Sequence, residues 1–402
     1  MAQRMQRICV VGPGTRFLSG ITYYTFGLCN ALSDRFVVSA ILIRQLLPKV
    51  LYPGRKRVGR AISTLTLPPD APVFDGIDWW WGPSLPRALR FLVRARPDVL
   101  ILQWWTGTVL HTYLVLALLA RLLRARIVIE FHEVLDTGED RLAMASLYVR
   151  IVAPWLFRLA SGYVVHSSFD ERLVAARYGE TNIPVRIIPH ATYDHYHQGG
   201  RWRAAPPDCC NLLYFGIIRP FKGVEDLIRA FDAIPPDEIH RYWLTVVGET
   251  WEGWTLPGEL IARSRYGDRI TFLNSYVPDD EVDSIFGGAD VVVLPYRRSS
   301  QSGPLHIALH YGLPVVVSAV GGLTEAVAGY EGAILTEPGD TAALLDAIRR
   351  GALLSGRRFD NPRDWATTAR LYEEFVELLP RLPRGGDDTK ARDTPCDAPY
   401  VP

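Results

Sequence analysis

Two cations in the second half of the chain have the spacing that a phosphate clamp requires. Arg219 and Lys222 flank a short turn, RPFKG, which follows the apolar segment 211–216. An arginine binds phosphate with a planar fork of N–H groups, and a lysine binds it as a compact point charge. A cation pair directly after a strand therefore predicts a diphosphate site, held without a dedicated metal ion.

A second anion-binding feature lies in residues 294–325. A polar loop, Arg297 to Gly303, leads into a helix that we expect to begin at Pro304 and to end near Gly312. The first turn of a helix presents free N–H groups and the positive end of the helix dipole, and both favour a phosphate. An ordinary loop–helix crossover is the alternative. If the feature binds phosphate, it would hold the diphosphate from the side opposite the two cations.

His132 is the third candidate. It follows the apolar segment 126–131, which is a predicted strand, and ligands of open parallel sheets gather beyond the carboxyl ends of the strands. The histidine is therefore placed for chemistry, although a purely structural histidine is equally compatible with this position.

The elements that must position these residues repeat one pattern, in which a strand and a turn are followed by a helix. In the first half we expect strands at 7–11, 37–43, 98–103, 126–131, 162–166 and 186–189, with helices at 21–32, 108–123, 142–160 and from 169. In the second half we expect strands at 211–216, 242–248, 269–273, 289–294 and 315–317, with helices at 224–231, 279–287, 304–312, 341–351 and 365–379. The pattern predicts an α/β protein with two doubly wound domains. Their expected bounds are 1–200 and 208–360, followed by a disordered tail at 381–402.

Composition limits the classes of function. The 402 residues carry a formal net charge of +1, which gives no global field for nucleic acid. The five cysteines have no metal-ligand spacing, which is typical of a reducing compartment. The N-terminus lacks a signal-peptide core, and no apolar run reaches the roughly 20 residues that span a bilayer. We therefore expect a cytoplasmic protein that is at most peripheral to a membrane.

One segment suggests where a membrane contact would form. Residues 44–60 carry Arg44, Lys49, Arg55, Lys56, Arg57 and Arg60 without any acid, interleaved with leucines. Such a segment can bind the anionic inner face of a membrane, and a solvated loop is the alternative. Aromatic clusters at 79–81 and 104–105 could stack on a sugar or cover a lipid chain, and residues of the core are the alternative.

Taken together, several motifs resemble the retaining glycosyltransferases of family 4. The strongest are FGIIRPFKGVEDLIRAF (215–231), ITFLNSYVPDDEVDSIFGGADVVVLPY (270–296), SGPLHIALHYGLPVVVS (302–318) and GGLTEAV (321–327). The first half matches more loosely, through VVGPGTRFLSGITYY, EFHEV and VRIIPHATYDHY. The resemblance implies the GT-B architecture, with two Rossmann-like domains facing across a cleft and a C-terminal helix, about 365–380, that crosses back to the first domain.

The resemblance also implies roles for individual residues. Arg219 and Lys222 would hold the diphosphate of a nucleotide-sugar donor, and His132 would lie beside the transferred sugar. The loop near Gly20 would close on the donor or the acceptor, and the neighbourhoods of Glu249 and of Tyr276 and Val277 would face the nucleobase. The backbone amides near Ser302, Gly303, Pro304 and Leu305 would help to hold the diphosphate. Pro304 itself has no N–H to give. No cofactor is implied beyond the donor.

The chain departs from the family in one respect. Family members often carry two glutamates in a Glu-x7-Glu motif, and those positions are Ser299 and Ile307 here. A subset of the family has a glutamine-serine-glycine version, which this chain matches with Gln301, Ser302 and Gly303. We interpret the departure as a variant site in which Ser299, Gln301 and Ser302 offer neutral hydrogen bonds to sugar or ribose hydroxyls.

The predicted reaction transfers a sugar to an acceptor hydroxyl with retention, in the biosynthesis of a glycan, polysaccharide or glycolipid. The acceptor would be a glycan, a lipid-linked sugar or a small molecule. The alternatives are a non-catalytic sugar-nucleotide binder or partner subunit, and an epimerase or phosphorylase of the same architecture. Nucleic-acid binding through 44–60 is disfavoured by the net charge and by the lack of a recognisable nucleic-acid module.

Overall fold

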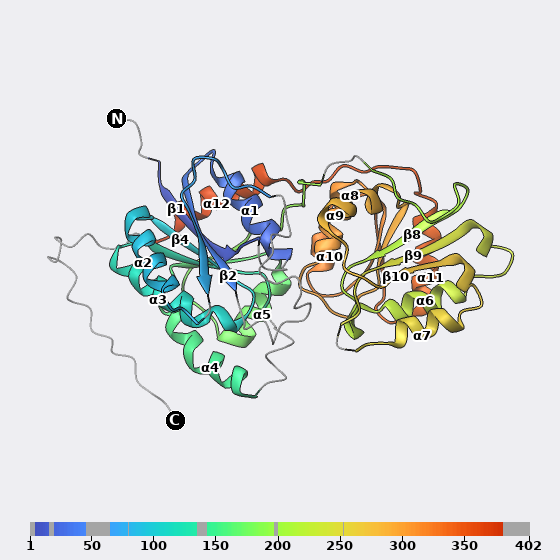
Figure 1. Cartoon of the computed structure of the whole chain (residues 1–402), viewed down its shortest axis with the longest axis horizontal. Helices are drawn as coiled ribbons and strands as arrows, with labels where there is room; N and C mark the ends of the chain where they lie inside the picture. Colours follow the sequence, from blue (N-terminus) through green and yellow to red (C-terminus); the bar gives the residue numbers. More distant parts are fainter. Residues whose placement is uncertain are drawn as a thin grey trace, which may run out of the picture.

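The chain forms two lobes, each built on its own sheet (Figure 1). The structure is a computed structural model that describes residues 5–15, 20–45, 65–78, 80–134, 143–196, 200–251 and 253–380. Within these residues every ladder between named strands is parallel. Because parallel strands need crossover helices, both faces of each sheet are covered by helices.

The N-terminal lobe has a seven-stranded sheet in the order β3-β2-β1-β4-β5-β6-β7 among the described residues. Its strands are β1 (Arg7–Pro13), β2 (Val37–Gln45), β3 (Val73–Asp78), β4 (Val99–Trp104), β5 (Arg126–Phe131), β6 (Gly162–Val165) and β7 (Val185–Ile187). Its helices are α1 (Gly20–Leu32), α2 (Ser84–Ala95), α3 (Leu110–Leu122), α4 (Ala143–Phe157) and α5 (Ser168–Tyr178). The strand order reverses between β1 and β4, which is where doubly wound sheets bind ligands.

The C-terminal lobe repeats this order with a six-stranded sheet, β10-β9-β8-β11-β12-β13, in the part of the chain that is described. Its strands are β8 (Cys210–Phe215), β9 (Tyr242–Val247), β10 (Ile270–Leu273), β11 (Val291–Leu294), β12 (Val315–Ser318) and β13 (Ala333–Thr336). Its helices are α6 (Val224–Asp232), α7 (Leu256–Arg263), α8 (Asp279–Gly287), α9 (Gly303–His310), α10 (Leu323–Ala326) and α11 (Thr341–Ala352). The prediction of two Rossmann-like domains is confirmed.

Apolar strands explain where the cores lie. β4 is buried along its whole length, so it packs against helices on both faces. On one face of the N-terminal sheet the core continues into α2, α3 and α4, and on the other it continues into α1 and α12 (Trp365–Leu378). One core spans the C-terminal lobe. These buried faces hold the carboxyl ends of the strands in fixed positions.

The last helix, α12, packs on the first lobe, as the family resemblance implied (Figure 1). The chain crosses to the second lobe before residue 200, the predicted end of the first domain. Tyr193 and Tyr196 already belong to the C-terminal core, and the Trp202 amide donates to the carbonyl of Ser284 at 2.8 Å. Both tyrosines carry large apolar rings, and burying these rings in the C-terminal core is favourable even though the surrounding segment is polar.

Some elements were not predicted. β3, VFDGID, has a glycine and two aspartates, so its apolar signal is weak. α2 carries three arginines, and its buried residues are few. Neither α7 nor β13 was expected, since both are short and only half-buried. Packing against neighbouring elements therefore stabilises these helices and strands more than their own composition does.

The predicted membrane segment 44–60 begins inside β2. Arg44 is part of that strand, and its Nε donates to Asp78 Oδ1 at 3.0 Å, so its charge is paired. Residues 46–60 of this segment, and the predicted tail at 381–402, lie outside the described residues. Among the residues that the structure describes, no helix has both the length and the apolar character to cross a bilayer.

Candidate active site

Arg219 and Lys222 lie where β8 ends, on a short 3-10 helix (Pro220–Lys222) that leads into α6. The Lys222 ammonium is 3.6 Å from the centre of the Tyr296 ring, and the Arg219 guanidinium is 4.7 Å from the centre of the Trp251 ring. Gly223 makes the tight turn possible, since its φ is +65° and a Cβ there would overlap the carbonyl of Pro295. The turn is thereby held against the loop that follows β11.

That loop feeds the N-terminus of α9, as predicted. Ser302 is the N-cap residue, and Pro304 occupies the first turn. The Ser302 hydroxyl accepts from the Leu305 amide at 3.3 Å and donates to the Tyr296 hydroxyl at 3.2 Å. The Leu305 amide is therefore used inside the protein, which corrects the expectation that it is offered to a ligand. Tyr296 contacts both Lys222 and Ser302, so the two halves of the predicted diphosphate clamp meet at one ring.

Lys222 also faces the first lobe. The dense packing around its ammonium is the main cause that lowers its pKa to about 7, and Arg219 adds to this effect. Glu133 opposes it, since a nearby carboxylate favours the charged lysine. Glu133 follows His132 directly in the chain, so the cations of one lobe lie opposite the histidine loop of the other.

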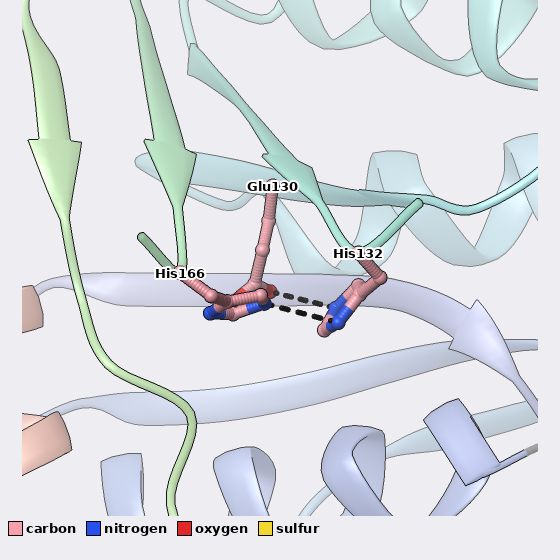
Figure 2. Close-up of side chains that lie close together, drawn as sticks. All are labelled: Glu130, His132 and His166. Atoms are coloured by element: carbon pink, nitrogen blue, oxygen red, sulfur yellow. Dashed lines mark hydrogen bonds and ion pairs between the residues drawn. The ribbon is translucent and has the colours of Figure 1, made fainter. Parts of the chain in front are cut away.

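His132 lies beyond the carboxyl end of β5 and is 7% exposed. Its Nδ1 shares a hydrogen bond with His166 Nε2 at 3.0 Å, and its Nε2 is 3.7 Å from Glu130 Oε2. Figure 2 shows both ring nitrogens turned toward these two partners. In this conformation neither nitrogen is directed at a sugar, so a polar contact with substrate would require the ring to rotate.

Glu130 anchors this cluster and has no exposed surface. Its Oε1 accepts from the Tyr24 hydroxyl at 2.7 Å, and its Oε2 accepts from Gln103 Nε2 at 3.3 Å. Burial alone would raise the pKa of Glu130. The two histidines and the Tyr24 hydroxyl together outweigh burial and lower this pKa to about 2. Burial lowers the pKa of His166 to about 4, which leaves His166 neutral at physiological pH.

Among the described residues, Glu130, His132 and His166 are also the group that could hold a metal ion. One ligand atom from each lies within 4.8 Å of the others. The oxygens of Glu130 already accept hydrogen bonds, and the two imidazoles bond to each other, so an ion would have to displace these contacts. The contacts present are those of a hydrogen-bonded network that orients His132.

Histidines also meet across the two lobes. The ring of His190, after β7, stacks on the ring of His306 in α9, with centroids 4.1 Å apart and planes inclined by 15°. Burial lowers the pKa of both, that of His306 to about 3. His306 Nε2 is also 3.3 Å from Gln301 Oε1, so Gln301 belongs to this contact. The N-terminal half of α9 is thus held against the first lobe.

The other predicted donor residues have the following positions. Gly20 begins α1, and its carbonyl accepts from the Tyr193 hydroxyl at 2.9 Å. The Glu249 carboxylate accepts from Trp251 Nε1 at 2.9 Å, which places it beside Arg219. Tyr276 and Val277 are half-buried in the loop between β10 and α8.

The two positions of the missing glutamates differ in their surroundings. Ser299 is half-buried, and its hydroxyl donates to the Gln301 carbonyl at 2.8 Å. Ile307 is 4% exposed and belongs to the core of the C-terminal lobe. Position 307 can therefore offer no polar contact, whereas position 299 remains beside the loop.

Sequence reasoning did not identify Glu130, His166, His190 or His306. One signal was available, because Glu130 is the only charged side chain within the apolar run IVIEF. A charge within such a strand needs a buried partner and marks a network. The histidines gave no comparable signal, because the tertiary fold alone brings them together.

A cavity of about 270 Å³ lies outside this cluster, between α1, residues 192–195 and Trp365. None of its lining residues is one of the predicted site residues. The cavity lies where residues 192–195, which connect the two lobes, meet the start of α12.

Comparisons with known proteins agree with this geometry. The model of the family described as "Glycosyl transferases group 1" matches residues 210–352, and that of the "Glycosyl transferase 4-like domain" matches residues 19–191. The chain is 31% identical over 222 residues to D-inositol 3-phosphate glycosyltransferase 2 of Catenulispora acidiphila, a match that covers 49% of this chain and 52% of that protein. It is 29% identical over 163 residues to O-antigen chain mannosyltransferase B of Escherichia coli, covering 40% of each. The chain thus spans about half the length of these curated relatives, or less.

Solved structures show the same fold over most of the chain. HepE of Anabaena, solved in complex with UDP, superposes with a TM-score of 0.63 at 16% identity, covering 93% of this chain and 100% of that one. Sucrose-phosphate synthase of Thermosynechococcus elongatus superposes with a TM-score of 0.57 at 20% identity, covering 93% and 94%. At these identities the likeness is one of fold.

Proposed function

The chain belongs to the family 4 type glycosyltransferases of GT-B fold, and on that premise we propose that it transfers a hexose from a nucleotide-diphosphate-sugar to an acceptor hydroxyl with retention of configuration. The observation that carries the proposal is the meeting of Lys222, Arg219 and the start of α9 around Tyr296. Two positive side chains and a helix N-terminus there match the charge of a diphosphate. The glycosyltransferases among its relatives support the class of reaction.

The proposed step breaks the bond between the anomeric carbon and the diphosphate oxygen. The acceptor oxygen bonds to the anomeric carbon on the same face, and its proton passes to the departing phosphate oxygen. Lys222 and Arg219 stabilise the negative charge that develops on that oxygen, which is the contribution that preorganised charges make in a transition state. Glu130 and His166 hold His132 at the edge of the site, beside the place proposed for the sugar.

We propose further that the reaction needs no resident metal or cofactor, since the chain's own cations can neutralise the leaving diphosphate. Turnover should therefore be unchanged by a chelator. A loss of turnover that added Mg²⁺ or Zn²⁺ restores would contradict this part of the proposal.

Replacing Lys222 tests the proposal directly. Lys222→Ala should lower donor-dependent transfer by about 100-fold or more, as the loss of one preorganised charge contact does. Arg265→Ala is the matched control, because Arg265 also lies over a tyrosine ring, 4.7 Å from the centre of the Tyr266 ring, and its Nη2 donates to the Ile234 carbonyl at 2.9 Å. Activity of Lys222→Ala within a few-fold of wild type would remove Lys222 from the role.

A non-catalytic sugar-nucleotide binder is the second candidate, and the burial of Ile307 at a motif-glutamate position favours it. Calorimetry with nucleotide sugars together with a turnover assay separates the two. Binding without turnover, with a panel of acceptors, would support the binder. Turnover without an acceptor would indicate an epimerase, and turnover driven by inorganic phosphate would indicate a phosphorylase.

The acceptor is proposed as a glycan, a lipid-linked sugar or a small molecule of glycan, polysaccharide or glycolipid biosynthesis, with the cytoplasmic side as the place of reaction. The basic segment 44–60 stays a predicted membrane contact, weakened by the pairing of Arg44 with Asp78. Thermal shifts with a panel of nucleotide sugars would identify the donor, since ligand at 100 times its Kd adds about 2.7 kcal/mol to the stability.

A further inference from the structure

The three helices on one side of the N-terminal sheet form a continuous outer layer. α2, α3 and α4 pack on the same core, and His111 of α3 is 3.2 Å from the Tyr148 hydroxyl of α4. Figure 1 shows them along the outside of the N-terminal lobe, away from the C-terminal lobe. Their solvent-facing side therefore forms one surface, which we call the α2–α4 face.

The exposed side of α4 is unusual for a helix in contact with water. Leu147, Ile151 and Trp155 recur every four residues and are 56%, 59% and 58% exposed. Residues four apart lie on the same side of a helix, so the three form one stripe. Arg150 and Arg158 lie along this stripe, and the Arg158 guanidinium is 5.0 Å from the centre of the Trp155 ring.

The neighbouring helices continue this composition. On α3, Leu118 and Leu122 are 48% and 81% exposed, and Arg121 between them is exposed as well. On α2 the exposed side carries Arg87, Arg90 and Arg94. No aspartate, glutamate or lysine occurs within α2, α3 or α4. The face therefore combines large exposed apolar side chains with positive charges that all come from arginine.

We propose that the α2–α4 face docks the protein on the surface of an anionic phospholipid bilayer. Apolar side chains that lie between arginines can enter the boundary between headgroups and acyl chains, while the guanidinium groups stay with the phosphates. The absence of acids from the three helices gives the charge complementarity that an anionic leaflet requires. This contact is peripheral, and it depends neither on the identity of the reaction nor on residues 44–60.

Other occupants fit the face less well. A second copy that docked through the same face would bring arginines against arginines, because a two-fold contact uses the same patch twice. The segment 381–402 carries four aspartates and four basic residues, so it lacks the net negative charge that would match. Nucleic acid would satisfy the arginines and would leave Leu122, Ile151 and Trp155 in water.

Vesicle sedimentation tests the proposal with the full chain. Wild-type protein should partition onto vesicles of equimolar phosphatidylcholine and phosphatidylglycerol, should release at high salt, and should bind vesicles of phosphatidylcholine alone far more weakly. The double variant Arg150→Gln with Arg158→Gln should have a partition coefficient about 30-fold lower than wild type, which corresponds to about 1 kcal/mol per arginine. Ile151→Ser with Trp155→Ser should weaken it by about 10-fold or more. All four side chains are exposed, so we expect these variants to fold normally.

Arg263→Gln with Arg350→Gln is the matched control, since both arginines are exposed on helices of the other lobe, and this variant should partition like wild type. Partition of both α2–α4 variants at the wild-type level would assign binding to another segment, such as 44–60, and would overturn the proposal. Failure of the wild type to bind anionic vesicles would overturn it as well. A lipid-free dimer that Trp155→Ser makes monomeric would show the face to be a self-association interface instead. Donor binding, measured in the same variants, should be unchanged, so this test is independent of the proposed reaction.

Discussion

At the scale of single residues, the first lobe of the site depends on a carboxylate that water does not reach. Glu130 lies inside β5, where it meets the Tyr24 hydroxyl and the Gln103 amide and faces His132. A buried carboxylate without partners would be strongly destabilising, so these contacts are necessary for the fold. Glu130 and His166 also face the two ring nitrogens of His132, which makes them positioning residues for it.

Glu130→Gln should separate positioning from folding. The amide keeps the shape and loses the charge that faces His132, so we expect kcat to fall at least about tenfold while the donor Kd stays within a few-fold of wild type. Glu238→Gln is the control, since that carboxylate pairs with Arg349 instead. An unchanged kcat would show that Glu130 acts only in stability.

The His190–His306 stack predicts a pH dependence of stability. The pKa of His306 falls from 6.5 to about 3 on folding, mainly through burial, so between these values the unfolded chain binds a proton that the folded chain does not. The stabilising contribution is complete above pH 6.5 and is lost as pH falls toward 3. Between about pH 7.5 and 5, wild type should lose about 2 kcal/mol more than His306→Phe in urea unfolding. The exposed His240→Gln variant should behave like wild type. Equal losses in all three proteins would contradict this assignment.

At the scale of elements, helix ends connect the two lobes. The Glu325 carboxylate on α10 accepts from the Ser168 amide at 2.7 Å and from the Phe169 amide at 3.1 Å, both at the N-terminus of α5. A carboxylate is stabilised by the N–H groups and the dipole of that helix end. Burial would raise the pKa of Glu325, but these hydrogen bonds outweigh it and lower the pKa. The family motif GGLTEAV thus contributes to the contact between lobes.

Glu325→Gln should weaken this contact. Because the carboxylate is half-exposed, we expect a loss of about 1 kcal/mol in the free energy of unfolding, together with a larger radius of gyration in small-angle scattering if the lobes separate. The control is Glu331→Gln, an exposed acid of the same lobe. If Glu325→Gln retains both the stability and the radius of wild type, α10 does not hold the lobes together.

At the scale of the whole molecule, α12 brings the end of the described chain back to the first lobe. Its buried residues Tyr372, Phe375 and Val376 complete the core under β1 and β4 of the first lobe. Trp365 begins the helix and packs against Gly27 of α1, where a Cβ would overlap the indole ring. The first domain is therefore incomplete without residues that follow the second.

Gly27→Ala tests this packing. The added methyl should overlap the Trp365 ring and cost about 1 to 3 kcal/mol of stability, as overpacking a core does. Trp365→Leu in the same chain should restore part of the loss, because the smaller side chain leaves room for the methyl. Gly258→Ala on α7 is the control, since its nearest neighbour is Phe272 at 3.6 Å. A Gly27→Ala variant as stable as wild type would show that the helix can shift without cost.

The sequence by itself determined the two sheets and most of their helices, because apolar periodicity and turn residues are local signals. Strand β5 was predicted at its observed bounds, and α8 likewise. The positions of Arg219, Lys222 and the start of α9 also followed from local motifs, since each lies in or after a loop that follows a strand.

Only the tertiary structure decided which distant side chains meet. The hydrogen bond of His132 with His166, the stack of His190 on His306, and the contact of Trp365 with Gly27 each join segments that no local pattern relates. The free energy of such contacts depends on packing between elements, and a side chain carries no mark of its partner. The same limit applies to the α2–α4 face, because periodicity shows that α4 is apolar and only the assembled lobe shows which of its residues remain in water.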